Sequence, residues 1–92
     1  MELPSGTRYN LGKEQMMIHE HDRVVLTDDL PVDGLQAGDV GTIVHAYRRR
    51  LAYEVEFLAL DGRTVAVATV AAAQVRAVRK GEIAHARQLV RA

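Results

Sequence analysis

The chain has 92 residues, with 12 basic and 12 acidic side chains and no cysteine or tryptophan. This length fits one small hydrophobic core, and a net charge of zero argues against a general nucleic-acid binder. The absence of cysteine excludes disulfide scaffolds, thiolate zinc sites and cysteine nucleophiles. The sequence has no apolar run long enough for a membrane span and no signal-peptide pattern at its start. We therefore expect a cytoplasmic protein that makes no membrane contact.

Small side chains dominate the apolar residues, with 13 Ala and 12 Val against one Phe and three Tyr. A core of such residues has little volume, so the strands around it must lie close together. This composition favours a small barrel of short strands over a two-layer fold with a large interior.

The chain divides into three predicted parts. Residues 1–17 lack any periodicity and are predicted to form an irregular leader, and residues 18–80 are predicted to form the barrel. Its first strand is expected at His21–Thr27, where β-branched residues alternate. Residues 28–39 contain four Asp, two Gly and one Pro, which indicates a long loop anchored by a few apolar side chains.

Alternating side chains predict the next three strands. Val40–Tyr47 places Ile43 and His45 on the same side, and Arg48–Arg50 forms the following turn. Leu51–Ala59 and Arg63–Val70 then form a hairpin around Asp61-Gly62.

The register of this hairpin depends on the length of its loop. A two-residue loop would set Phe57 opposite Ala66. We favour a three-residue loop with Gly62 in a left-handed conformation, because it sets Phe57 opposite Val65 and gathers the large apolar side chains on one face.

The last part of the chain is predicted to leave the sheet. A tight turn and a short strand at Val75–Val78 are followed by a break at Gly81. Residues 81–92 are predicted to form a C-terminal helix, because Ile83, Ala86 and Leu89 recur at helical spacing. The expected fold is therefore mainly all-β, an SH3-like barrel of five or six short strands with a C-terminal helix.

Two stretches resemble a known family. The first runs from His21-Asp22-Arg23-Val24-Val25-Leu26 through Gly38-Asp39-Val40-Gly41-Thr42-Ile43-Val44, and the second is Tyr53-Glu54-Val55-Glu56-Phe57 followed by Asp61-Gly62-Arg63-Thr64-Val65-Ala66. They are similar to a small bacterial family classed as a domain of unknown function, DUF4926. The resemblance covers about residues 20–78 and implies an SH3-like barrel. Members of that family often lie beside toxin genes, which implies an antitoxin or immunity role and no catalytic residues.

The sequence predicts no catalytic residue, no metal ligand and no cofactor. His19 and His21 are two imidazoles without the further ligands that a closed site needs. Glu54 and Glu56 share a strand face, but such alternation is more typical of a solvated surface than of a paired-carboxylate site. We therefore expect a non-enzymatic protein.

The charge pattern points instead to interaction with another protein. Residues 20–39 carry a net charge of −5, residues 76–92 carry +4, and the arginine turn adds +3, which would steer a charged partner or a second copy. The predicted partner-binding residues are Asp28, Asp29, Asp33, Tyr47, Arg48, Arg49, Arg50, Tyr53, Arg87 and Arg91. The expected partner is a protein, for instance a toxin, or a second copy in a homodimer.

Two other functions remain open at this stage. Arg48–Arg50 beside Tyr47 could contact phosphates, as in nucleic-acid-binding modules of the KOW type. An accessory subunit of a metalloenzyme is the third class, and it rests on analogy of fold alone.

Overall fold

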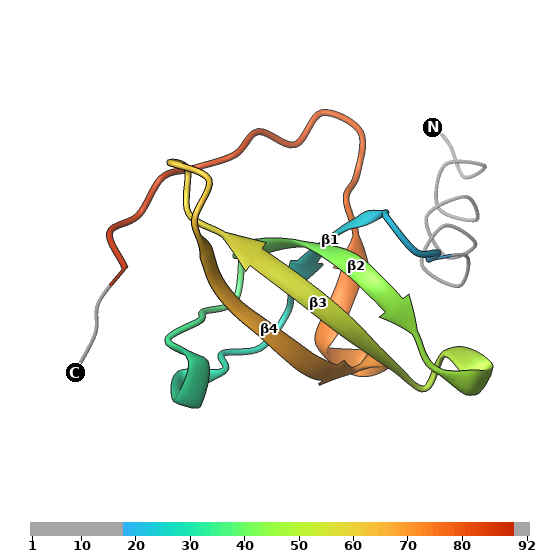
Figure 1. The fold of residues 1–92 in the computed structure, drawn as a ribbon. Helices are drawn as coiled ribbons and strands as arrows, with labels where there is room; N and C mark the ends of the chain where they lie inside the picture. Colours follow the sequence, from blue (N-terminus) through green and yellow to red (C-terminus); the bar gives the residue numbers. More distant parts are fainter. Residues whose placement is uncertain (1–17, 90–92) are drawn as a thin grey trace.

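A computed structural model describes residues 18–89, which form five short strands (Figure 1). The strands are β1 (Arg23–Leu26), β2 (Val40–Ala46), β3 (Ala52–Leu58), β4 (Thr64–Ala71) and β5 (Val75–Ala77), with 3-10 turns η1 (Pro31–Asp33), η2 (Arg48–Arg50) and η3 (Ala72–Gln74). The mainly-β, five-strand prediction is confirmed over this part of the chain. The predicted leader, residues 1–17, lies outside the described residues.

All five strands belong to one antiparallel sheet in the order β4-β3-β2-β1-β5. The long loop after β1 and the short connection through η3 let the sheet curl on itself, as Figure 1 shows. Strands β4 and β5 are therefore consecutive in the chain but stand at opposite ends of the hydrogen-bonded order.

The core is built from the inner face of this curled sheet. Eleven buried side chains form one cluster: Ile18, Val24, Leu26, Leu35, Ile43, Tyr53, Val55, Phe57, Ala68, Val70 and Val75. Gly41 marks the tightest place, because a Cβ atom there would lie 2.5 Å from Val55 Cγ1 and 2.8 Å from a Phe57 ring carbon. This confirms the close backbone approach expected of a core made from small residues.

The β3–β4 hairpin has the predicted loop but not the predicted register. Its loop is three residues long, since the Ala59 amide donates to Arg63 O at 2.8 Å, and Gly62 is left-handed with φ 93°. A bulge at the end of β3 then shifts the pairing by one residue, so that Phe57 lies opposite Ala66 rather than Val65. Simple alternation missed the bulge, which lets both Val65 and Ala66 pack against the core.

A second bulge changes which side chains β2 exposes. The pairing shifts between Ile43 and His45, so Ala46 lies opposite Tyr53 on the core side and His45 lies opposite Glu54 on the outer face. The prediction that Ile43 and His45 share one side is therefore wrong, because the extra residue reverses the alternation beyond it.

The predicted C-terminal helix does not form over residues 82–89, which are irregular and run along the upper side of the molecule in the view of Figure 1. A helix of about ten residues is marginal by itself. Two ion pairs tie the segment to the sheet instead: Arg76 to Glu82 at 2.6 Å and Arg87 to Asp39 at 2.6 Å. We call residues 79–89 the strap. Residues 90–92 lie outside the described part.

Candidate functional site

The arginine turn, η2, projects from the sheet between β2 and β3 (Figure 1). Arg49 and Arg50 have φ values of 61° and 53°, a left-handed conformation that bends the chain sharply. Arg50 Nε donates a 2.9 Å hydrogen bond to Ile18 O, so this guanidinium anchors the turn to the segment before β1. One nitrogen of the Arg50 guanidinium is therefore used within the chain, although the residue itself is exposed.

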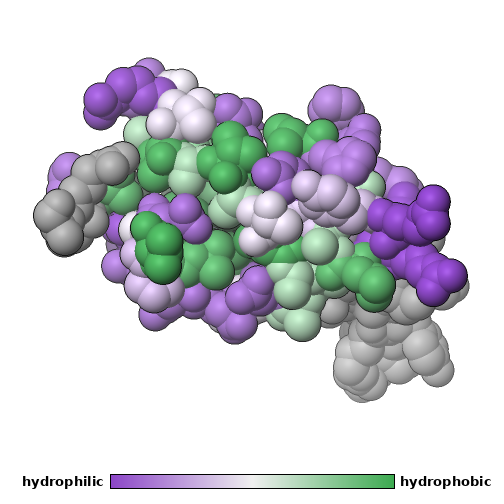
Figure 2. Space-filling model, turned by 60° about the horizontal axis from the view of Figure 1, so that its bottom comes forward, coloured by the Kyte–Doolittle hydropathy of each residue, from purple (hydrophilic) through white to green (hydrophobic). Residues whose placement is uncertain are grey.

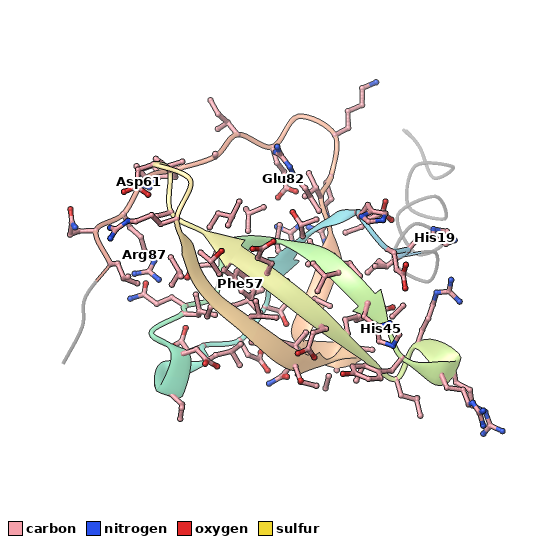
Figure 3. All side chains as sticks on the ribbon, viewed as in Figure 1. His19, His45, Phe57, Asp61, Glu82 and Arg87 are labelled. Atoms are coloured by element: carbon pink, nitrogen blue, oxygen red, sulfur yellow. The ribbon has the colours of Figure 1, made fainter. Side chains whose placement is uncertain are left out.

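A polar cluster on the outer face supports the base of the turn. Glu54 Oε1 accepts hydrogen bonds from Thr69 Oγ1 at 2.6 Å and from the Tyr47 hydroxyl at 3.2 Å. The hydrogen bond to Glu54 raises the pKa of Tyr47 above its usual value. His45 meets the Tyr47 ring edge to face, with the ring centroids 4.6 Å apart (His45 in Figure 3). These contacts fix the orientation of Tyr47.

Tyr53 is a core residue and not a surface contact. Its side chain is only 3% exposed and packs within the buried cluster, and this burial raises its pKa. The sequence pattern grouped Tyr53 with Tyr47 because both flank the arginines, but the inward alternation of β3 buries Tyr53. Its prediction as a partner-binding residue is incompatible with this burial.

The exposed part of the turn combines one aromatic, one aliphatic and two basic side chains. Tyr47 and Leu51 are exposed by 41% and 70%, and Arg48 and Arg49 form no ion pair with any residue of the described chain. We call Tyr47, Arg48, Arg49 and Leu51 the tip. A shallow hollow beside the tip is also lined by His19 and Glu20.

The hollow beside the tip offers a surface for contact. It is open to solvent and combines basic and acidic side chains. Within residues 18–89, no three metal-ligating side chains come together. The chemistry that the tip offers is charge pairing, aromatic stacking and apolar contact.

Carboxylates of the acidic loop, residues 28–39, accept hydrogen bonds from the backbone of the same loop. Asp29 Oδ1 accepts a 2.9 Å hydrogen bond from the Ala37 amide, and Asp39 Oδ2 accepts one of 2.8 Å from the Gln36 amide. Asp28 and Asp33 are exposed. The predicted acidic surface thus retains three exposed aspartates, of which Asp29 also stabilises the turn that its residue type favours.

The strap brings together charges that are far apart in the sequence, because its Arg87 pairs with Asp39 of the acidic loop. Arg87 reaches Asp39 with hydrogen bonds of 2.8 and 2.6 Å and also donates to Gly34 O at 3.0 Å. Figure 3 shows Arg87 at this end of the molecule, far along the strap from Glu82. Arg87 therefore binds the acidic loop of its own chain and does not stand free for a partner. Arg91, also predicted as a contact, lies outside the described residues.

The two strap anchors lie on either side of β1. In the sheet, Val25 pairs with Arg76 on β5 and with Val40 on β2, which directly follows Asp39. Val25 is 7% exposed although it does not belong to the inner core cluster. The strap is thus tied to both neighbours of β1, through Arg76 on β5 and through Asp39 directly before β2.

Lowering the pH should break the ion pair between Arg76 and Glu82, which is the first of the two contacts that hold the strap. The hydrogen bond from Arg76, followed by that from the Arg79 amide, lowers the pKa of Glu82 to about 2 from a usual 4.5. Because the folded pKa is the lower one, this stabilising contribution is complete above about pH 4.5 and is lost as the pH falls through about 2. We expect NMR titration of the Glu82 carboxyl to show a midpoint near 2.

The Arg76→Gln variant provides the control for this titration. It removes the main hydrogen bond that lowers the pKa of Glu82, so its midpoint should rise toward 4.5. A midpoint near 4.5 in the unmodified chain would show that Glu82 does not hold the strap.

A further feature is the edge of the sheet at β4, which pairs with β3 on one side and with no other strand of the described residues on the other. This strand stands at one end of the strand order, is eight residues long and contains no charged side chain. Sequence reasoning did not single out this strand. The signal was available, because Thr64–Ala71 is an uncharged stretch without Gly or Pro.

A family model described as a domain of unknown function, DUF4926, matches residues 20–77. The match covers more than half of the chain and all five strands, so the chain belongs to the DUF4926 family. No curated protein and no solved structure gives a significant match. In the described residues, no helix has the length and apolar character needed to cross a membrane.

Proposed function

We propose that this chain is a non-catalytic, cytoplasmic protein-interaction module that binds a protein partner through the tip. The observation that carries the proposal is the exposed set Tyr47, Arg48, Arg49 and Leu51 at the far end of the sheet. Tyrosine and arginine are the residue types enriched at the centres of protein interfaces. The proposed architecture beneath the tip is an SH3-like barrel, supported by the long β1–β2 loop and the single η3 turn before β5.

The anchoring of the tip supports binding. Arg50 ties the turn to Ile18, and Glu54 holds the Tyr47 hydroxyl. A contact surface that is already ordered loses less conformational entropy on binding, so more of the contact energy is retained as affinity. Exposed Arg48 and Arg49 favour a partner with an acidic patch.

The partner we propose is a small toxin encoded beside this gene, which the module would neutralise by covering its active surface. This role needs binding but no chemistry, in agreement with the contact-type surface at the tip. Asp28 and Asp33 offer an exposed acidic surface that could contact basic groups of the same partner.

Nucleic-acid binding is the alternative, and the geometry favours it less. Arg50 Nε donates to Ile18 O, so part of its guanidinium is already used within the chain. Glu20 lines the same hollow, and its carboxylate would repel phosphate. The zero net charge adds no general attraction for a polyanion.

Survival of cells that express the neighbouring gene tests the proposal. We expect its product to be toxic alone and harmless when co-expressed with this chain, whereas the double variant Arg48→Glu/Arg49→Glu should restore toxicity at equal protein level. Cells that grow normally without this chain would contradict the antitoxin role. Binding of single-stranded RNA or DNA oligonucleotides at low salt, lost in the same variant, would support the alternative.

A further inference from the structure

Among residues 18–89, the edge of β4 pairs with no further strand and lacks the protection that natural edge strands usually carry. Such strands are commonly short, or bear Lys or Pro, because unpaired backbone groups invite another chain to add a strand. β5, the other edge, has three residues, and its Arg76 is held by Glu82 of the strap. β4 has eight residues, no charge and no Pro, and its Val67 is 51% exposed. Figure 2, in which the bottom of Figure 1 comes forward, shows exposed apolar groups among the polar ones on that face.

The register identifies which backbone groups face outward. The Ala72 amide donates to Leu51 O, and hydrogen-bonded pairs alternate along an antiparallel ladder. Ala68 and Val70 therefore bond to β3, whereas the amides and carbonyls of Val67 and Thr69 point to the open edge.

The ends of β4 are not available in the same way. The Ala71 amide donates to Gln74 Oε1 at 2.9 Å, and Val65 occupies the bulge near the start of the strand. Within the described chain, the edge thus offers one short regular unit, centred on Ala68 and flanked by Val67 and Thr69.

We propose that a second copy of this chain pairs with β4 in antiparallel orientation, with the two-fold axis at Ala68. Val67 then lies opposite Thr69 of the partner subunit, and Thr69 lies opposite the partner's Val67. An axis at Val67 would require the bulged Val65, and an axis at Thr69 would require the occupied Ala71 amide. The register at Ala68 uses both open residues of each copy and forms four backbone hydrogen bonds.

The side chains of β4 suit pairing with the β4 strand of a second copy better than pairing with an unrelated chain. In a symmetric strand pair, any charged side chain would come close to its own equivalent, and β4 has none between Thr64 and Ala71. The nearest carboxylates, Glu54 and Glu56 on β3, already accept hydrogen bonds from Thr69 and Thr64. Opposed Val and Thr side chains are both β-branched, as strand pairs prefer.

This pairing uses none of the tip residues, so it is independent of partner binding there. Two subunits joined through β4 would form one continuous ten-stranded sheet and carry two tips. Failure of dimerisation would therefore leave the tip proposal intact, and failure of tip binding would leave the dimer intact.

Sedimentation equilibrium of the full chain from about 1 µM to 1 mM, a span that covers weak to moderate association, tests the pairing. We expect a monomer–dimer equilibrium in which Val67→Lys weakens association at least tenfold, because the lysines approach each other across the axis. The matched control Val32→Lys adds the same charge at a site that is 98% exposed on η1 and should dimerise normally. A monomeric chain throughout, or equal effects of the two lysines, would overturn the proposal.

Amide hydrogen exchange of the unmodified chain gives a second test that needs no variant. The Val67 and Thr69 amides should exchange fast in dilute solution and slow down as the concentration rises, because the second copy supplies acceptors that the described residues of the chain do not. The neighbouring Ala68 and Val70 amides, bonded to β3, should be protected at every concentration. Exchange at Val67 and Thr69 that does not change with concentration would overturn the proposed register.

Discussion

Phe57→Ala is expected to lower the free energy of unfolding by about 3–5 kcal/mol, the usual cost of removing a buried aromatic ring. Phe57 is the one phenylalanine of the chain, lies 2% exposed, and packs where Gly41 lets β2 approach β3. Half of the other core side chains are Val or Ala, and the close packing of Gly41 against Val55 and Phe57 leaves little room for a neighbour to move into the cavity. Urea denaturation followed by circular dichroism measures the change, and total stability for so small a domain is marginal.

Leu58→Ala is the matched control for this experiment. Leu58 follows Phe57 on the same strand, but its side chain lies on the outer face and is 52% exposed. Its truncation should change stability by less than about 0.5 kcal/mol, as is typical of surface positions. Equal losses in the two variants would contradict the account of the core.

Charge reversal at the tip is expected to have the largest effect on partner binding. Loss of two interface arginines at about 2 kcal/mol or more each corresponds to a fall in affinity of roughly 1,000-fold. The variant Arg48→Glu/Arg49→Glu should show this loss against the product of the neighbouring gene in isothermal titration calorimetry. Its thermal unfolding should remain close to normal, because neither arginine has an ion-pair partner in the described chain.

The control for the tip is Arg63→Glu/Lys80→Glu, which makes the same change in net charge elsewhere on the surface. Arg63 lies at the β3–β4 hairpin beside Asp61 and Lys80 lies on the strap, and both are exposed. This control should retain most of the affinity of the unmodified chain. A similar loss in both double variants would show that overall charge, rather than the tip, governs binding.

The strands could be predicted because their alternation follows from burial on one face. Gly62 was also predictable, because the three-residue hairpin loop needs a left-handed residue there. The glycine at position 41 lies inside a strand, and its reason, the close approach to Val55 and Phe57, is visible only in the structure. The two bulges were not predictable, because each inserts one residue whose place is decided by packing across strands. The bulge between Ile43 and His45 moved His45 to the outer face, and that near Val65 shifted the whole hairpin register.

The C-terminal segment could not be predicted for a similar reason, because its charged side chains bind residues that are distant in the sequence. Helical spacing of Ile83, Ala86 and Leu89 predicted a helix, but Arg87 and Glu82 find partners on the sheet that a local pattern cannot reveal. Of the predicted site, the structure leaves Tyr47, Arg48 and Arg49 together and exposed, whereas Tyr53 is buried and Arg50 and Arg87 are engaged within the chain. Which residues a partner can reach is therefore decided by long-range contacts.

Direct binding between this chain and the product of the neighbouring gene tests the central claim. Calorimetric titration of the two purified proteins should give a saturable isotherm with a dissociation constant of about 1 µM or tighter, a value in the usual range for specific interfaces. A folded chain that gives no binding signal at about 100 µM of either protein would contradict its proposed role as an interaction module for that partner.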